Sequence, residues 1–191
     1  MPYRTALVFA KTKLDWIHSQ SVEEALFTSG QIIGKAHELR FMVSTKSTKP
    51  SSRITDSLVI ITHPIKVSTR SAAVQDTAER AAIRALRQEA SIALPGRLAQ
   101  LAKVHDFVYE DVSIKQLKGR WGSCDQKQHI ALNLFLMQLP WELIDYVLLH
   151  ELVHTKHMHH GPDFWEALEE VQPGAKKLRS AIGKHKPVVM R

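Results

Sequence analysis

Cysteine is almost absent from this chain, since Cys124 is the single example among 191 residues. One thiol excludes an internal disulfide, and it excludes zinc fingers and ribbons that need two or four cysteine ligands. No apolar run approaches the roughly 20 residues of a membrane helix, and the apolar stretch near the N-terminus is too short for a secretory signal. We therefore expect a soluble, cytoplasmic protein without a membrane partner.

Two signatures of phosphate chemistry are also missing. The chain has no glycine-rich P-loop and no cluster of carboxylates that would hold paired magnesium ions. Its net charge of +7 is moderate, and ordinary solubility charge accounts for it at least as well as a nucleic-acid partner does. Nucleic-acid binding is therefore not indicated, although a nucleotide stays open as a partner.

A change of composition divides the chain after its first third. Residues 1–69 have strand-type segments separated by polar turns. From Ser71 the sequence is rich in Ala, Arg and Glu, which predicts a helix to Leu94 and, after an interruption at Pro95-Gly96, a short second helix. We expect an α+β fold with a β-rich N-terminal region (1–69) followed by a larger second domain (70–191).

The last third predicts a hairpin followed by helices. Residues 112–124 and 129–137 have strand-type sequences around a short polar turn, and the second segment alternates its side chains between two faces. Pro140 suits the first turn of the next helix, residues 141–157. A final helix, residues 162–183, is interrupted or ended by a Pro-Gly pair in its middle.

The most specific pattern is an H-E-x-x-H motif at the end of the predicted helix 141–157. His150 and His154 are four residues apart, so on a helix their imidazoles project from one face and can bind one zinc ion. Glu151 is not a ligand in this arrangement; it faces the open coordination position and can act as general base on zinc-bound water. The same motif could also arise from an accidental pair of exposed histidines or from a closed structural zinc site.

A catalytic zinc site of this kind needs a third protein ligand. His160 completes H-E-x-x-H-x5-H, the spacing of the metzincin motif, but His157 stands where that motif has its turn glycine. The spacing favours His160 nevertheless. The alternatives are a neighbouring imidazole and the carboxylates of the next helix: His159, Glu166, Glu169 and Glu170.

Further side chains near the motif have two interpretations each. Arg120 could stabilise an oxyanion or bind a substrate phosphate or carboxylate, or it could pair with an acidic residue. Tyr146, one turn before the motif, could contact the substrate or simply pack in the helix. Asp145 or Asp163 could orient a ligand histidine. For Cys124 we expect a structural role, because nothing in the sequence supplies a neighbouring base.

Several linked segments resemble one family. They are RWGSC (120–124), I-x-L-N (130–133), PWELIDYVLLHELVH (140–154), and His160 followed by Asp163-Phe164-Trp165. In this order they resemble the YgjP-like family of predicted zinc metallopeptidases, which is related to the SprT and WLM-type minimal zincins. The match is close over about residues 105–182 and looser over residues 25–104.

The resemblance implies a minimal zincin-like fold, in which a helix packs on a small antiparallel sheet and an active-site helix carries the motif. It also implies that His160 is the third ligand and that strand 129–137 borders the cleft and pairs with an extended peptide. The chain departs from the family in its short N-terminal portion, where the Trp16-Ile17 pair comes early. It also lacks the cysteines of the SprT zinc ribbon.

The sequence therefore predicts a zinc-dependent hydrolase, in the first place a metallopeptidase that binds one Zn2+ per chain and acts on peptide or protein substrates. The predicted roles are metal ligation by His150, His154 and His160, general base catalysis by Glu151, and substrate binding by Arg120 and Tyr146. One alternative is a metal-dependent nucleotide phosphohydrolase that uses the cations Arg80, Arg84, Lys115, Lys118 and Arg120. The other is a non-enzymatic module with a structural metal.

Overall fold

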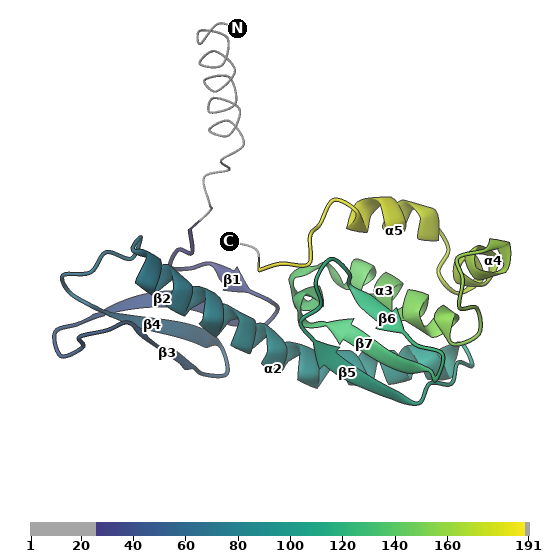
Figure 1. The fold of residues 1–191 in the computed structure, drawn as a ribbon, viewed down its shortest axis with the longest axis horizontal. Coiled ribbons are helices and arrows are strands. Elements are labelled where there is room, and N and C mark those ends of the chain that lie inside the picture. Colours follow the sequence, from purple (N-terminus) through teal and green to yellow (C-terminus); the bar gives the residue numbers. More distant parts are fainter. Residues whose placement is uncertain (1–25, 190–191) are drawn as a thin grey trace, which may run out of the picture.

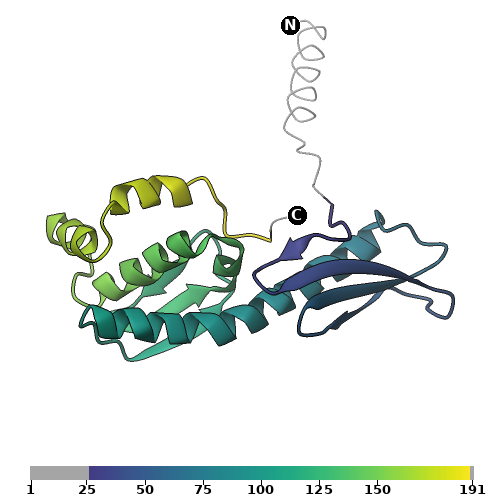
Figure 2. The ribbon, with the colours of Figure 1, turned by 180° about the vertical axis from the view of Figure 1, so that it is seen from behind.

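The computed structural model describes residues 26–189, and it places two small sheets along one long helix (Figures 1 and 2). A four-stranded sheet lies along the first part of this helix, α2, and a three-stranded sheet with the remaining helices lies along its second part. The fold is mixed α+β, as predicted, but the expected antiparallel sheet is wrong, because each of the two sheets contains a parallel pair of strands. The Trp16-Ile17 pair and the rest of the first 25 residues lie outside the described part.

The N-terminal sheet has the strand order β1-β2-β4-β3. Its strands are β1 (Ile32–Ile33), β2 (His37–Ser44), β3 (Ser51–Ile54) and β4 (Leu58–Pro64). Burial alternates strictly along β4, which indicates that one face of the sheet is covered, and α2 covers it. Strands β2 and β4 are parallel, and the connection between them contains β3, which pairs with β4 on the outer edge.

Helix α2 (Ala72–Val104) is continuous, so the predicted interruption at Pro95-Gly96 is wrong. A proline inside a helix removes one backbone hydrogen bond and disfavours the helix by about 3 kcal/mol. Here the leucines on both sides of it, Leu94 and Leu98, are fully buried in the core. Their packing holds the helix together across Pro95. The predicted boundary at residues 69 and 70 falls where α2 begins, but α2 contacts both sheets, and the two-domain division stays a prediction.

The second sheet corrects the predicted role of strand 129–137. Its strands are β5 (Asp111–Lys115), β6 (Gly122–Cys124) and β7 (His129–Asn133), in the order β5-β7-β6. Strand β7 is parallel to β5 and antiparallel to β6, so it is the central strand and cannot pair with a peptide. The edge strands are β5 and β6. A predicted hairpin is present, but its second strand is short.

Strand β7 ends at Asn133 because this side chain directs the chain into a turn. The Asn133 amide donates to the carbonyls of Leu117 and Arg120 and its oxygen accepts from the N–H of Phe135. The 3-10 helix η1 (Leu134–Gln138) follows, and its apolar residues Leu134 to Met137 are buried on all sides. The second half of the predicted strand 129–137 is therefore a buried 3-10 helix in the core.

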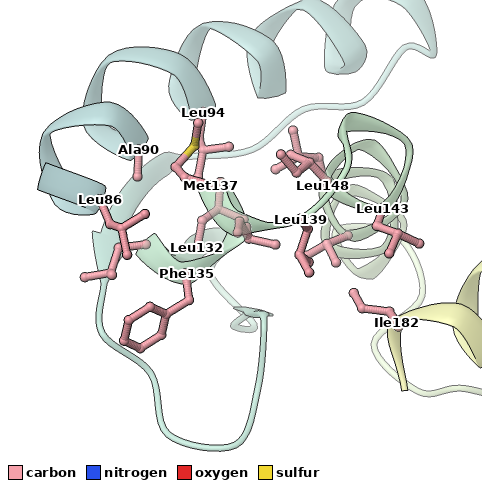
Figure 3. Packing of buried hydrophobic residues seen from close by; sticks show 14 of the residues in the cluster. Leu86, Ala90, Leu94, Leu132, Phe135, Met137, Leu139, Leu143, Leu148 and Ile182 are labelled. Atoms are coloured by element: carbon pink, nitrogen blue, oxygen red, sulfur yellow. The ribbon is translucent and has the colours of Figure 1, made fainter. Parts of the chain in front are cut away.

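The remaining helices are α3 (Trp141–His154), α4 (Pro162–Val171) and α5 (Ala175–Ile182). The predicted interruption of the last helix is confirmed, since Gly174 adopts a φ of 83° between α4 and α5. Figure 3 shows Leu94 of α2, Met137 of η1 and Leu148 of α3 in one packed core. Within residues 26–189, no helix has the length and apolar character needed to cross a membrane.

Candidate metal centre

Three histidine side chains meet at the C-terminal end of α3. His150 and His154 lie on its last turns, and His160 comes from the loop between α3 and α4. The Nε2 atom of His160 is 3.0 Å from Nε2 of His150 and 3.1 Å from Nε2 of His154. The structure thus brings the three predicted ligands together, and they form the one group of metal-ligating side chains found among the described residues.

The donor set fits a metal ion. Nitrogens bound to one tetrahedral zinc ion at about 2.0–2.1 Å are roughly 3.3 Å apart, close to the separations seen here. Nδ1 of His154 lies 3.0 Å from the carbonyl oxygen of His157, which can only accept, so Nδ1 carries the proton and Nε2 carries a lone pair. Lone pairs facing one another at this distance repel, and a shared cation relieves that repulsion.

The pKa values of these histidines favour the same assignment. Burial, together with the neighbouring imidazoles and Arg179, lowers the pKa of His150 to about 3. Burial is also the main cause that lowers the pKa of His154 and of His160. All three imidazoles are therefore neutral at pH 7 and can act as ligands. In the described part of the chain, the buried Nδ1 of His150 has no hydrogen-bond partner.

Aromatic side chains from α4 support the three imidazoles. Phe164 is fully buried, and its ring centroid lies 4.6–4.9 Å from all three histidine rings. Trp165 stacks on His160, with 5.9 Å between the ring centroids. The guanidinium carbon of Arg179 lies 4.7 Å from the centroid of the Trp165 ring. His160 itself is exposed to solvent. Its contacts with the aromatic residues of α4 therefore hold its ring in place.

Glu151 lies next to the first histidine and is 5% exposed. None of the described residues is seen to donate a hydrogen bond to its carboxylate. Burial raises the pKa of Glu151 to about 8, and the charge of Arg120 opposes this increase. Gly122 of β6 packs directly against the carboxylate, because a Cβ atom at that position would lie 2.6 Å from Oε1 of Glu151.

The competing ligands lie elsewhere. His159 is exposed and is not part of the histidine group, and the carboxylates Glu166, Glu169 and Glu170 line a separate surface hollow beside Trp165. The prediction that Asp145 orients a histidine is wrong, because Asp145 forms an ion pair with Arg97 of α2, with a separation of 2.6 Å. The exposed Asp163 begins α4, and no hydrogen bond joins it to a ligand histidine within residues 26–189. The carbonyl of His157 has the orienting position instead.

The predicted substrate-binding residues lie on two sides of the centre. Tyr146 is 4% exposed, and its ring is 6.0 Å from that of His150. Arg120 is exposed at the approach to β6, and no ion pair to an acidic residue is found for it within residues 26–189. Cys124 is partly buried, and its pKa is raised to about 11 by burial and by the charges of Glu151 and Asp125, which argues against a nucleophilic role.

Sequence reasoning missed three contributors. Gly122 lies inside the RWGSC segment, but only the packing of β6 against α3 shows why a glycine is needed there. Phe164 was noted as part of a motif without its position beneath the histidines. Arg179 gave no signal, because its approach to Trp165 depends on how α5 folds back.

Comparison with known proteins fits this geometry. The profile of the YgjP-like metallopeptidase domain matches residues 1–185. The chain belongs to the YgjP-like metallopeptidase family. Members of this family are enzymes of the metallopeptidase type, which implies a catalytic metal ion and a peptide or protein substrate.

Two solved structures resemble part of the chain. One is the metallopeptidase zymogen abylysin of Pyrococcus abyssi, with 26% identity, coverage of 53% of this chain and 93% of that chain, and a TM-score of 0.41. The other is the metallopeptidase zymogen jannalysin of Methanocaldococcus jannaschii, with 19% identity, coverage of 53% and 94%, and a TM-score of 0.41. A comparison with curated proteins gives no match.

Proposed function

We propose that this YgjP-like metallopeptidase is a zinc peptidase whose ligands are His150, His154 and His160. The convergence of three Nε2 atoms beside the buried, unpaired carboxylate of Glu151 carries the proposal. A structural zinc site would need a fourth protein ligand. Among the described residues no fourth histidine, cysteine or carboxylate joins the group.

Zinc supplies a Lewis acid that polarises the peptide carbonyl and lowers the pKa of water. Glu151 takes the proton of the attacking water and delivers it to the leaving amine. Burial raises the pKa of Glu151 above that of an exposed glutamate, which makes its carboxylate a stronger base for the first of these steps. Tyr146 is proposed to contact the substrate from the side of His150, and Arg120 from the side of β6.

The edge of β6 offers the place for an extended peptide. Strand β6 pairs with β7 on one side, and no described strand pairs with its other side. A peptide added there would gain backbone hydrogen bonds and would pass Gly122, next to Glu151. This replaces the expectation that strand 129–137 holds the substrate.

The nucleotide alternative has less support. Arg80 donates a hydrogen bond to Thr77 within α2, and Arg84 donates to Ser52 of β3. Arg84 thus lies against the N-terminal sheet, and neither of these arginines lines the pocket that contains Lys115 and Arg120. A peptide substrate also agrees with the family.

The test is to measure bound zinc and peptide hydrolysis together in untagged protein. We expect about one zinc ion per chain in the wild type and loss of zinc in His160→Ala. His159→Ala is the matched control, because it removes the neighbouring exposed imidazole, and it should retain zinc. In Glu151→Gln, zinc should be retained while hydrolysis falls by roughly a thousandfold. Zinc retained in His160→Ala would contradict the ligand set.

A further inference from the structure

The three-stranded sheet has a small pocket where Ser113, Ala131 and Ser123 lie side by side. Its volume is about 280 Å3, and its lining includes Ser113 and Lys115 of β5, Ser123 of β6, and Arg120. The strand register explains the grouping, since Ser113 and Ser123 both pair with Ala131 of the central strand from opposite sides. The pocket therefore spans the sheet and ends at the edge strand β6.

The pocket has cations that are not used within the fold. Neither Lys115 nor Arg120 forms an ion pair with an acidic side chain in the part of the chain that the structure describes. The backbone carbonyl of Arg120 accepts from Asn133, which fixes the residue while leaving its guanidinium exposed. The hydroxyls of Ser113 and Ser123 add two donors without a partner among residues 26–189.

One acidic residue, Asp125, also lines this pocket, and the turn between β6 and β7 holds its carboxylate. Oδ1 of Asp125 accepts the N–H groups of Lys127 and His129 at 2.8 and 3.0 Å, which closes the turn between β6 and β7. Oδ1 of Asp111 lies 3.0 Å from Nδ1 of His129. Within residues 26–189 neither Lys115 nor Arg120 forms an ion pair with Asp125, and these two cations outnumber the single lining carboxylate, so the pocket keeps a positive charge for an anion from outside.

The pocket is adjacent to the metal centre through β6. Gly122 touches Glu151 on one face of this strand, and Ser123, the next residue, lines the pocket on the opposite face. The side chains of an extended peptide paired with β6 would also alternate between the two faces of the sheet. If one peptide residue lies beside Glu151, the side chain of the next residue points towards the pocket. The charge of Arg120 also acts on the pKa of Glu151, which agrees with this proximity.

We propose that Arg120 and Lys115, with the hydroxyls of Ser113 and Ser123, bind a carboxylate of the peptide substrate beside the scissile bond. This rests on the proposed peptidase function and adds a preference for acidic peptides to it. An arginine binds a carboxylate through two parallel hydrogen bonds, and two serine hydroxyls can complete the contacts. The carboxylate comes from an Asp or Glu side chain or from the C-terminus of a short peptide.

The test uses a mixture of synthetic peptides with zinc-loaded protein, and mass spectrometry of the cleaved products. Cleaved peptides are then remade in pairs that carry Glu or Gln beside the scissile bond, each with a free or an amidated C-terminus. We expect about a tenfold higher kcat/KM for the peptide that carries the carboxylate. Comparing the Glu and Gln peptides tests a side-chain carboxylate, and comparing the free and amidated peptides tests the C-terminal carboxylate.

Arg120→Gln and Lys115→Gln should each reduce this preference severalfold, and both side chains are exposed, so the fold should tolerate them. Lys127→Gln is the matched control, because it removes a positive charge from the turn of the same sheet without lining the pocket, and it should retain the preference. Cleavage without a carboxylate preference, or a preference unchanged in Arg120→Gln, would overturn the proposal.

A binding measurement separates this inference from the proposed function. Fluorescence anisotropy with labelled Glu and Gln peptides is measured on Glu151→Gln, whose Arg120 and Lys115 are intact. Tighter binding of the Glu peptide supports the pocket even if no peptide is cleaved. Equal binding overturns it, whereas a failure to cleave any peptide counts against the peptidase function alone.

Discussion

Two buried glutamates, one in each half of the molecule, have opposite surroundings. Glu89 of α2 is 7% exposed and Glu151 of α3 is 5% exposed. Glu89 accepts the N–H groups of Lys35 and Ala36, and its Oε1 lies 2.6 Å from Nδ1 of His37. Glu151 also has a histidine beside it in the sequence, but no such partner is found for its carboxylate among the described residues.

The comparison extends to one glycine at each site. A Cβ atom at Gly34 would lie 2.2 Å from Oε2 of Glu89, and a Cβ atom at Gly122 would lie 2.6 Å from Oε1 of Glu151. Both glycines thus make room for a carboxylate. A buried carboxylate that accepts hydrogen bonds from another element holds the two elements together. A buried carboxylate without such partners destabilises the fold, and such groups are typical of sites that bind a substrate or a metal. The surroundings of Glu89 fit a structural role, and those of Glu151 fit the catalytic role that we propose for it.

The largest expected contrast comes from replacing each carboxylate by an amide. Glu151→Gln should lower kcat/KM by roughly a thousandfold, because general base catalysis is lost, with little change in the free energy of unfolding. Glu89→Gln should lower the free energy of unfolding by about 1–3 kcal/mol, because the N–H groups of Lys35 and Ala36 donate to different oxygens of Glu89 and the NH2 group that replaces one of these oxygens cannot accept. Urea unfolding and peptide hydrolysis, measured on both variants, test whether one variant loses activity and the other loses stability. If Glu151→Gln instead lowers the free energy of unfolding, Glu151 has a structural role like that of Glu89.

Methyl groups at the two glycines give a smaller contrast. Gly122→Ala pushes on the Glu151 carboxylate and should reduce kcat/KM on the order of tenfold, since misplaced catalytic groups lose rate steeply. Gly34 has a φ of 68°, so Gly34→Ala adds backbone strain to its clash with Glu89 and should destabilise the fold by about 2 kcal/mol. Thermal unfolding and steady-state kinetics of both variants check these values. Equal losses of activity per folded molecule would remove the distinction between the sites.

The sequence was sufficient to predict the motif because helix geometry is local. The four-residue spacing of His150 and His154 places both rings on one face in any helix, whatever surrounds it. His160 was favoured by spacing, but its approach depends on the loop after α3, which turns through hydrogen bonds such as His157 N–H to Val153 O at 2.9 Å. Such a turn has no strong sequence signal.

The errors came from interactions between distant parts of the chain. Pro95 normally interrupts a helix, but the buried leucines around it keep α2 continuous. The family resemblance suggested that segment 129–137 borders the cleft, and local patterns did not reveal its parallel partner β5, which makes it the central strand. The contact between Gly122 and Glu151 likewise depends on how a strand packs on a helix.

The smallest expected effect concerns Cys124, which reports on the unpaired charge of Glu151. In metal-free protein, burial and the charges of Glu151 and Asp125 raise the pKa of Cys124 to about 11, so its thiol stays protonated at pH 7 to 9. The rate of alkylation should therefore rise about tenfold per pH unit up to pH 10, whereas an ordinary cysteine levels off above its pKa of about 8.5. Above pH 8, where Glu151 is ionised, Glu151→Gln should lower the pKa of Cys124 and increase this rate severalfold, whereas Glu89→Gln should leave it unchanged. Equal alkylation rates in the wild type and Glu151→Gln above pH 8 would show that the charge of Glu151 is compensated, and the contrast between the two glutamates would then be lost.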